Sequence, residues 1–187
     1  MFILRKIYEF LLDAVQTILL AASVFLVIYI FIARPFQVSG LSMFPTFKDK
    51  EYILTNLIVL RFQTPKRGDV IVFKAPKDPD KDFIKRVIGA SGDSVYIKDG
   101  FVYVNNKKLD ESGYLKNDVR TYSGSFLNEG KIVTVQEDEY FVMGDNRPYS
   151  SDSREFGPIK FSAIIGESMF VYWPPNAMRI VKNPFNR

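Results

Sequence analysis

Ser42 is the first residue of this sequence whose surroundings suggest chemistry. It lies in the stretch QVSGLSMFPTF, residues 37–47, where glycine and proline indicate a turn. Serines often act only as turn formers, so a chemical role requires a partner that activates the hydroxyl. The 187 residues include no histidine and no cysteine, which removes the commonest general base, disulfides and thiol nucleophiles. A base for Ser42 would therefore be a lysine, a carboxylate or the terminal amine.

Lys85 is the candidate base. It lies in DFIKRVIG, residues 82–89, which has the pattern of a strand. Strict alternation would place Lys85 between Phe83 and Val87 on one face and Arg86 on the other. Arginine keeps its proton, whereas a desolvated lysine loses it readily, so only Lys85 of this pair could act as a base. Most strand lysines simply reach solvent, however, and no local spacing shows that Ser42 and Lys85 meet.

The stretch MGDNRPYSSDSREFGP, residues 143–158, is the third chemical feature and contains two Asp-to-Arg spacings. It could be a polar turn with surface ion pairs, which contribute little to stability. Its hydroxyl, carboxylate and guanidinium groups could instead build a rigid polar network against an active site. The pattern alone leaves both interpretations open.

The elements that must position these residues begin with an apolar segment. Residues 14–33 carry no charge, and about 20 residues at 1.5 Å rise match a hydrocarbon core of roughly 30 Å. We expect a retained transmembrane helix here, because Arg34-Pro35 follows where a signal peptide would have a small-residue cleavage site. Basic residues flank the segment on both sides, so charge bias leaves its orientation open. The net charge of +4 favours contact with membrane lipid only slightly.

Beyond the span, the sequence predicts a single, mainly β domain, either barrel-like or a pair of packed sheets. Asp99-Gly100 lies between two alternating runs and favours a tight hairpin turn. Residues 106–128 are polar and irregular, typical of a surface loop. The predicted division is a short N-terminus (1–13), a transmembrane helix (14–33) and a β-rich domain (34–187). The predicted strands are residues 52–60, 69–75 and 82–89, the hairpin 93–105, and residues 131–145 and 164–173.

The ordered set of PFQVSGLSMFPTF, RGDVIVF with FIKRVIGASGD, and MGDNRPYSSDSR resembles type I signal peptidase, the bacterial leader peptidase family of membrane-bound Ser-Lys proteases. The resemblance covers nearly the whole chain. It implies that Ser42 is the nucleophile and Lys85 the general base. It also implies a cytoplasmic N-terminus and a catalytic domain on the outer face of the bacterial cytoplasmic membrane. The implied substrates are signal peptides of exported preproteins, with no cofactor.

The resemblance also assigns roles to neighbouring residues. It implies that Ser150 hydrogen-bonds the catalytic lysine, that Asp152 and Arg154 form a bracing ion pair, and that Asp145 and Arg147 are structural. Some relatives place a hydroxyl residue, which helps to bind the oxyanion, two positions before the nucleophile, where this chain has Gly40. The Ser42 backbone N–H is then the expected donor, and the second donor is undefined. Met43 and Pro45 are expected to shape the turn, and the expected substrate-binding residues are Phe36, Val38, Met43, Phe83 and Ile84.

These assignments predict cleavage after an Ala-x-Ala sequence, with the substrate added as a strand. Two other classes of function remain open. A self-cleaving Ser-Lys repressor domain would carry a DNA-binding module where this chain has its apolar span, and a non-catalytic anchored β-domain would need neither Ser42 nor Lys85. A metal site would have to be built mainly from oxygens, and the Asp/Glu pattern suggests none. Nucleic acid is not an expected partner.

Overall fold

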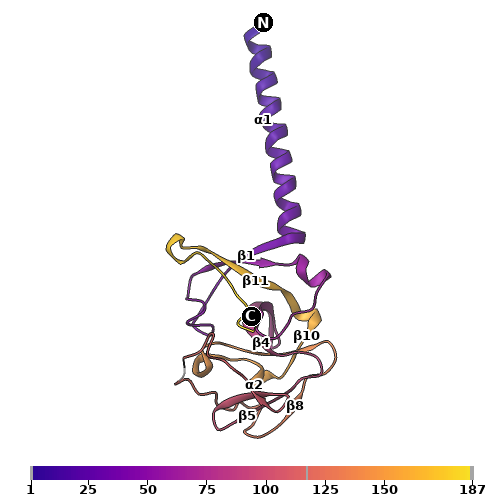
Figure 1. Cartoon of the computed structure of the whole chain (residues 1–187). Coiled ribbons are helices and arrows are strands. Elements are labelled where there is room, and N and C mark those ends of the chain that lie inside the picture. Colours follow the sequence, from indigo (N-terminus) through magenta and orange to yellow (C-terminus); the bar gives the residue numbers. More distant parts are fainter. Residues whose placement is uncertain (1, 117, 186–187) are drawn as a thin grey trace.

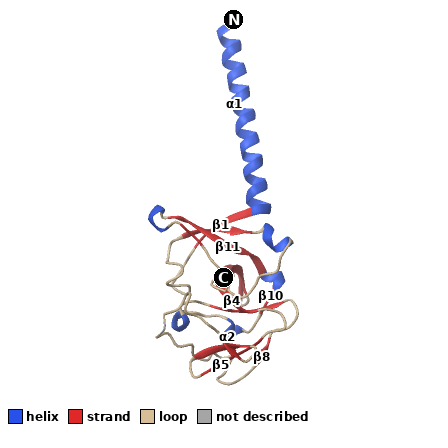
Figure 2. Cartoon of the chain, viewed as in Figure 1, coloured by secondary structure: helices blue, strands red, loops and turns tan. Residues whose placement is uncertain are grey.

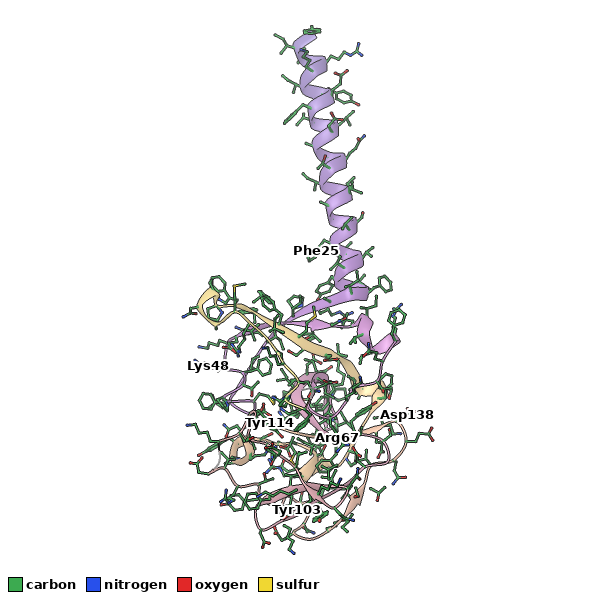
Figure 3. All side chains as sticks on the ribbon, viewed as in Figure 1. Phe25, Lys48, Arg67, Tyr103, Tyr114 and Asp138 are labelled. Atoms are coloured by element: carbon green, nitrogen blue, oxygen red, sulfur yellow. The ribbon has the colours of Figure 1, made fainter. Side chains whose placement is uncertain are left out.

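The computed structural model describes residues 2–116 and 118–185. Its N-terminal helix α1 spans Phe2–Val27, continues as the π-helix η1 (Ile28–Ile32) and leads directly into strand β1 (Ala33–Gln37). The helix extends away from the β domain and buries none of its residues (Figure 1). Phe25, for example, projects into the surroundings from the helix surface (Figure 3).

This helix is long and apolar enough to cross a membrane over Phe2–Ile32. Its 31 residues correspond to about 46 Å at 1.5 Å per residue, which exceeds the roughly 30 Å of a hydrocarbon core. The helix is thus longer than the transmembrane segment expected for residues 14–33, and the position of that segment within the helix stays a prediction. The helix includes residues 2–13 because most of these residues are also apolar. It ends before Ala33, which pairs with Asn56 in the sheet.

The main sheet contains eight strands, and all of its pairs are antiparallel. Its order is β1-β2-β11-β3-β4-β9-β10, with β12 paired to β11, and it forms the upper part of the domain, beside the helix (Figure 2). Besides β1, its strands are β2 (Tyr52–Asn56), β3 (Val70–Ala75), β4 (Asp78–Gly89), β9 (Glu139–Met143), β10 (Ile159–Lys160), β11 (Ile164–Trp173) and β12 (Arg179–Ile180).

A second sheet has the order β7-β6-β5-β8 and lies at the end of the domain far from the helix (Figure 1). The predicted hairpin is confirmed: Lys98 pairs with Phe101, and both Asp99 and Gly100 have positive φ, as a tight primed turn requires. An apolar cluster that includes Ile97, Val102 and Phe141 lies between the two sheets. The strands of this sheet are β5 (Ser94–Lys98), β6 (Phe101–Val104), β7 (Lys107–Lys108) and β8 (Val133–Thr134).

The mainly β fold class, with packed sheets behind one apolar helix, is confirmed, but two predicted strands are shorter than expected. The strand predicted for residues 52–60 ends at Asn56, whose side chain accepts a hydrogen bond from the Val59 N–H and starts a 3-10 turn. The strand predicted for residues 131–145 is divided by a turn in which Asp138 has positive φ. The short helices are η2 (Ile58–Arg61), η3 (Arg147–Tyr149), α2 (Ser153–Phe156), η4 (Phe161–Ala163) and η5 (Pro175–Ala177).

Within the described residues 106–116 and 118–128, the segment predicted to be irregular contains only the strand β7, but it is more than a surface loop. Thr121 and Leu127 are buried. The backbone N–H groups of Phe126 and Leu127 donate to the carbonyl of Arg154. This segment therefore packs against the stretch that follows β9, which carries the third chemical feature of the sequence.

Candidate active site

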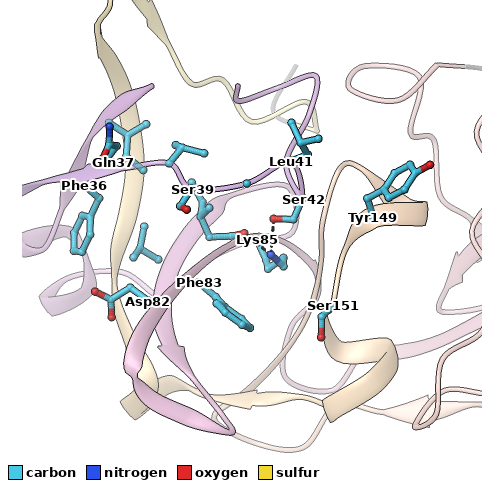
Figure 4. Close-up of a pocket in the computed structure, with 15 residues that line it drawn as sticks. Phe36, Gln37, Ser39, Leu41, Ser42, Asp82, Phe83, Lys85, Tyr149 and Ser151 are labelled. Atoms are coloured by element: carbon cyan, nitrogen blue, oxygen red, sulfur yellow. Dashed lines mark hydrogen bonds between the residues drawn. The ribbon is translucent and has the colours of Figure 1, made fainter. Parts of the chain in front are cut away.

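Ser42 and Lys85 meet in the folded chain. The Lys85 Nζ donates to the Ser42 Oγ across 2.8 Å and to the carbonyl oxygen of Ile84 across 3.0 Å (Figure 4). Lys85 comes from the middle of β4, whereas Ser42 lies in the turn between β1 and β2. The Lys85 side chain lies 5.2 Å from the centre of the Phe83 ring, and the residue is only 4% exposed. An amine and a hydroxyl are thus held together in an apolar environment.

Burial sets the protonation behaviour of Lys85. Desolvation lowers the pKa of Lys85 from its ordinary value of 10.5 to about 8, because the apolar surroundings penalise the charged form. The carboxylates of Asp152 and Asp145 oppose this shift, and the Arg154 guanidinium adds to it. The result is a lysine with an appreciable neutral fraction near neutral pH, as a general base requires.

The turn that carries Ser42 is held at its base by backbone hydrogen bonds. The Val38 N–H donates to the Glu51 carbonyl, and the Lys50 N–H donates to the Val38 carbonyl, both at 2.8 Å. Gly40 has φ +89°, a left-handed conformation that strains other residues, and its N–H donates to the Asp49 carboxylate at 2.7 Å. The Gly40 N–H is therefore occupied, while the Ser42 N–H has no acceptor within residues 2–116 and 118–185.

The C-terminal strand also holds this turn. Arg179, in β12, donates to both carboxylate oxygens of Glu51, at 3.0 and 2.6 Å, and to the Thr46 carbonyl at 2.5 Å. Glu51 is only 2% exposed, and although burial opposes ionisation, the Arg179 hydrogen bond and charge, with the Lys48 N–H, hold the pKa of its carboxyl below the ordinary value. The ion pair between Glu51 and Arg179, which are far apart in the sequence, thus fixes the second half of the turn that carries Ser42.

Asn146 holds the turn that carries Ser42 from the other side. Its backbone N–H donates to the Ser42 carbonyl at 3.0 Å, and its Nδ2 donates to the Leu41 carbonyl at 2.9 Å. Gly144 allows this approach, because a Cβ there would lie 2.4 Å from the Ser42 carbonyl oxygen and 2.2 Å from the Ser150 Oγ. Sequence reasoning did not select Asn146. The available indication was its position in the GDNR stretch, beside the charged residues that were selected.

Asp145 and Arg86 form an ion pair in which both side chains are almost fully buried. The Arg86 guanidinium donates to the two Asp145 oxygens at 2.8 and 2.6 Å and to the Gly68 carbonyl at 2.7 Å. Thr46 donates to the same carboxylate at 2.5 Å, which connects the ion pair to the turn that carries Ser42. Because an almost fully buried guanidinium needs a paired carboxylate, this ion pair is an internal part of the structure around Ser42 and Lys85.

Asp152 and Arg154 form the second ion pair. The Arg154 Nε and Nη2 each lie 2.8 Å from one Asp152 oxygen, and the Gly144 N–H donates to Asp152 at 3.0 Å. Burial alone would raise the pKa of Asp152, but the Arg154 and Gly144 contacts outweigh it and keep the pKa below the ordinary value. Asp152 therefore stays charged and braces the stretch that follows β9.

Arg147 and Ser150 complete this stretch. The buried Arg147 donates to Thr121 Oγ1 at 2.6 Å and to the Gly144 carbonyl at 3.0 Å, and it pairs with Glu111. The expected hydrogen bond between Ser150 and Lys85 is not found among the described residues; the buried Ser150 side chain instead lies beside Asp152, and its hydroxyl helps to lower the pKa of that carboxyl. The hydrogen bonds that the Lys85 Nζ donates go to Ser42 and Ile84.

A cleft of about 340 Å³ opens beside the Ser42–Lys85 pair. Phe36, Val38, Phe83 and Ile84 line it, as expected for substrate-binding residues, but Met43 does not. Met43 is only 1% exposed because it packs into the apolar cluster beneath the turn. Pro45, in the turn, faces a different cavity. The remaining lining residues are Gln37, Ser39, Gly40, Leu41, Ser42, Ile53, Val72, Asp82, Lys85, Tyr149 and Ser151.

A long apolar helix thus leads directly into a β domain, in which a serine and a buried lysine meet at an open cleft. Residues 11–173 match the family described as "Signal peptidase, peptidase S26", and the chain belongs to this family. It is therefore a serine endopeptidase, a hydrolase, and its apolar helix fits a membrane anchor.

Named relatives agree with this assignment. Signal peptidase IB of Staphylococcus aureus (strain MRSA252) is 35% identical over 187 residues, covering 94% of this chain and 96% of the relative. Signal peptidase I S of Bacillus subtilis (strain 168) is 36% identical over 173 residues, covering 90% and 92%. Among solved structures, a signal peptidase I from Enterococcus faecalis V583 matches 56% of this chain and 97% of its own, with 31% identity and a TM-score of 0.47.

Proposed function

We propose that this chain removes signal peptides from exported preproteins, with Ser42 as the nucleophile and neutral Lys85 as the general base. The observation that carries the proposal is the 2.8 Å hydrogen bond between Ser42 Oγ and the Nζ of a lysine that is only 4% exposed. Family membership supports the substrate class, since the relatives are named signal peptidases.

The reaction proceeds through an acyl-enzyme. Lys85 Nζ takes the Ser42 proton as Oγ attacks the carbonyl carbon of the last signal-peptide residue, and the protonated Nζ then protonates the leaving amine of the mature protein. Water, deprotonated by the same amine, hydrolyses the ester. The Ser42 N–H supplies one oxyanion donor. The fixed contacts of Asn146 with the Leu41 and Ser42 carbonyls support a preset direction for this N–H.

The cleft supports binding of the signal peptide as an extended segment between β1 and β4. Phe36 and Val38 line it from one side, and Asp82 and Ile84 line it from the other. Side chains of an extended peptide alternate, so the last and third-last residues would point into the protein together. Val38, together with the buried residues Ile53 and Val72, adds compact apolar side chains to the lining. We expect these side chains to leave a shallow space for the last and third-last signal-peptide residues, which suits alanine and excludes larger side chains.

Location follows from the anchor. The helix leads directly into β1, the strand that borders the cleft, so a spanning helix would hold the site close to a membrane surface. We place the N-terminus in the cytoplasm and the β domain on the outer face, where the signal peptide of an exported protein arrives. Membrane lipid is then the immediate neighbour of the anchor, whose side chains are exposed along its length.

The test is cleavage of a purified preprotein in detergent, at an Ala-x-Ala site and at the same site with phenylalanine as the last signal residue. We expect cleavage only of the alanine substrate, and none by Ser42→Ala. Ser162→Ala is a matched control, since Ser162 is exposed and outside the cleft. Cleavage by Ser42→Ala at the wild-type rate would contradict the assignment of the nucleophile, and equal cleavage after phenylalanine would contradict the assigned pocket.

A further inference from the structure

Two large side chains at the cleft remain exposed although they lie beside the Ser42–Lys85 pair. Tyr149 is 76% exposed and Leu41 is 56% exposed, and both line the cleft. Neither belongs to the three apolar clusters of the described residues. The role assigned so far to this cleft, binding of the signal peptide between β1 and β4, uses neither side chain.

Tyr149 is exposed but its backbone is firmly held. It ends the 3-10 helix η3, and its N–H donates to the Asn146 carbonyl at 3.0 Å. The preceding proline restricts this turn further. Asn146 in turn binds the carbonyls of Leu41 and Ser42. Asn146 thus links the backbone of Tyr149 to the backbones of Leu41 and Ser42. The Cα positions of Tyr149 and Leu41 are therefore fixed beside Ser42.

The position of Tyr149 relative to Ser42 indicates which part of a substrate it would meet. Figure 4 shows Phe36, Gln37 and Asp82 on one side of the Ser42–Lys85 pair, and Tyr149 and Ser151 on the other. Attack on a peptide carbonyl leaves the acyl part of the substrate on one side of the nucleophile and the amine part on the other. If the acyl part lies between β1 and β4, the amine part must leave past Tyr149.

We propose that Tyr149 and Leu41 form a subsite for the first residues of the mature protein, the segment that follows the cleaved bond. This inference rests on the proposed function. Its ligand is an extended peptide segment with an apolar side chain at its first or second position, which the tyrosine ring and the leucine side chain would cover. An aromatic ring with a fixed backbone can provide contact area at a small cost in conformational entropy.

The experiment separates this subsite from the signal-peptide site with two substrates. The first is a peptide with an Ala-x-Ala signal segment followed by two apolar residues. The second is the methyl ester of the same signal segment, which ends at the cleaved bond and has no residue to contact the subsite. Both are measured as kcat/KM in detergent with the full chain, for the wild type, Tyr149→Ala and Tyr149→Phe. Phe62→Ala is the control, because Phe62 is a 79% exposed ring that does not line the cleft.

Tyr149→Ala should lower kcat/KM for the peptide about tenfold, the effect expected for losing contact with an aromatic ring, and leave the ester unchanged. Tyr149→Phe should retain wild-type rates on both substrates, because the ring rather than the hydroxyl makes the contact. An equal loss on both substrates, or no loss on the peptide, would overturn the subsite. Failure of the wild type to cleave either substrate would instead overturn the proposed function, so the two failures are distinguishable.

Discussion

Replacement of Lys85 by arginine tests the proposed base most directly. The difference between the ordinary pKa of 10.5 and the value of about 8 corresponds to about 3 kcal/mol against the charged form. At pH 7 a pKa of about 8 leaves roughly one lysine in ten neutral, compared with about one in 3,000 at 10.5. Burial therefore increases the neutral base about 300-fold. Arginine keeps the charge and much of the length but has no accessible neutral form.

The assay is the rate of preprotein cleavage between pH 6 and pH 10, for the wild type, Lys85→Arg and Lys81→Arg. The wild-type rate should rise about tenfold per pH unit below about pH 8 and become constant above it. Lys85→Arg should be inactive throughout. Lys81 lies on the same strand but is exposed and outside the cleft, so Lys81→Arg should follow the wild-type profile.

Thermal melting of Lys85→Met provides an independent measure of the same pKa. Because the folded-state pKa is lowered, the folded protein binds fewer protons than the unfolded chain between about pH 8 and 10.5. The contribution of the lowered pKa to stability is fully present above the unfolded value and is lost as the pH falls through about 8. The wild type should therefore gain stability across this window relative to Lys85→Met, which should be inactive but folded.

Near-normal turnover of Lys85→Arg, or an acidic limb centred near pH 5 as for a carboxylate, would refute the Ser-Lys mechanism.

Two further predictions concern the surroundings of the pair. Asp152→Asn removes a carboxylate that raises the pKa of Lys85, so the acidic limb of its residual activity should move to lower pH; an unchanged or higher midpoint would contradict the electrostatic argument. Deletion of residues 1–32 should leave a folded domain that still cleaves a signal-peptide substrate in detergent, because no residue of α1 is buried. Loss of the near-UV circular dichroism signal, which reports fixed tertiary packing, would show instead that the helix is needed for folding.

The fold was predictable where it depends on neighbouring residues. The uncharged run of residues 14–33 indicated a helix, and Asp99-Gly100 between alternating runs indicated the hairpin, because both signals are local. Element ends were less accurate. The strand at residues 52–60 continues in its apolar pattern, but the Asn56 side chain ends it with a hydrogen bond to the Val59 N–H that hydrophobicity does not reveal.

For the candidate site, the sequence by itself determined the available chemistry, and the tertiary structure decided the contacts. Without histidine or cysteine, a serine nucleophile had to rely on an amine or a carboxylate, and only residue types were needed to see this. The pairing of Lys85 with Ser42, of Arg86 with Asp145 and of Asn146 with Leu41 joins residues 43, 59 and 105 positions apart. These distances depend on the order and register of antiparallel strands, which no local pattern specifies. The lowered pKa of Lys85 likewise comes from burial between packed layers, so it exists only in the folded protein.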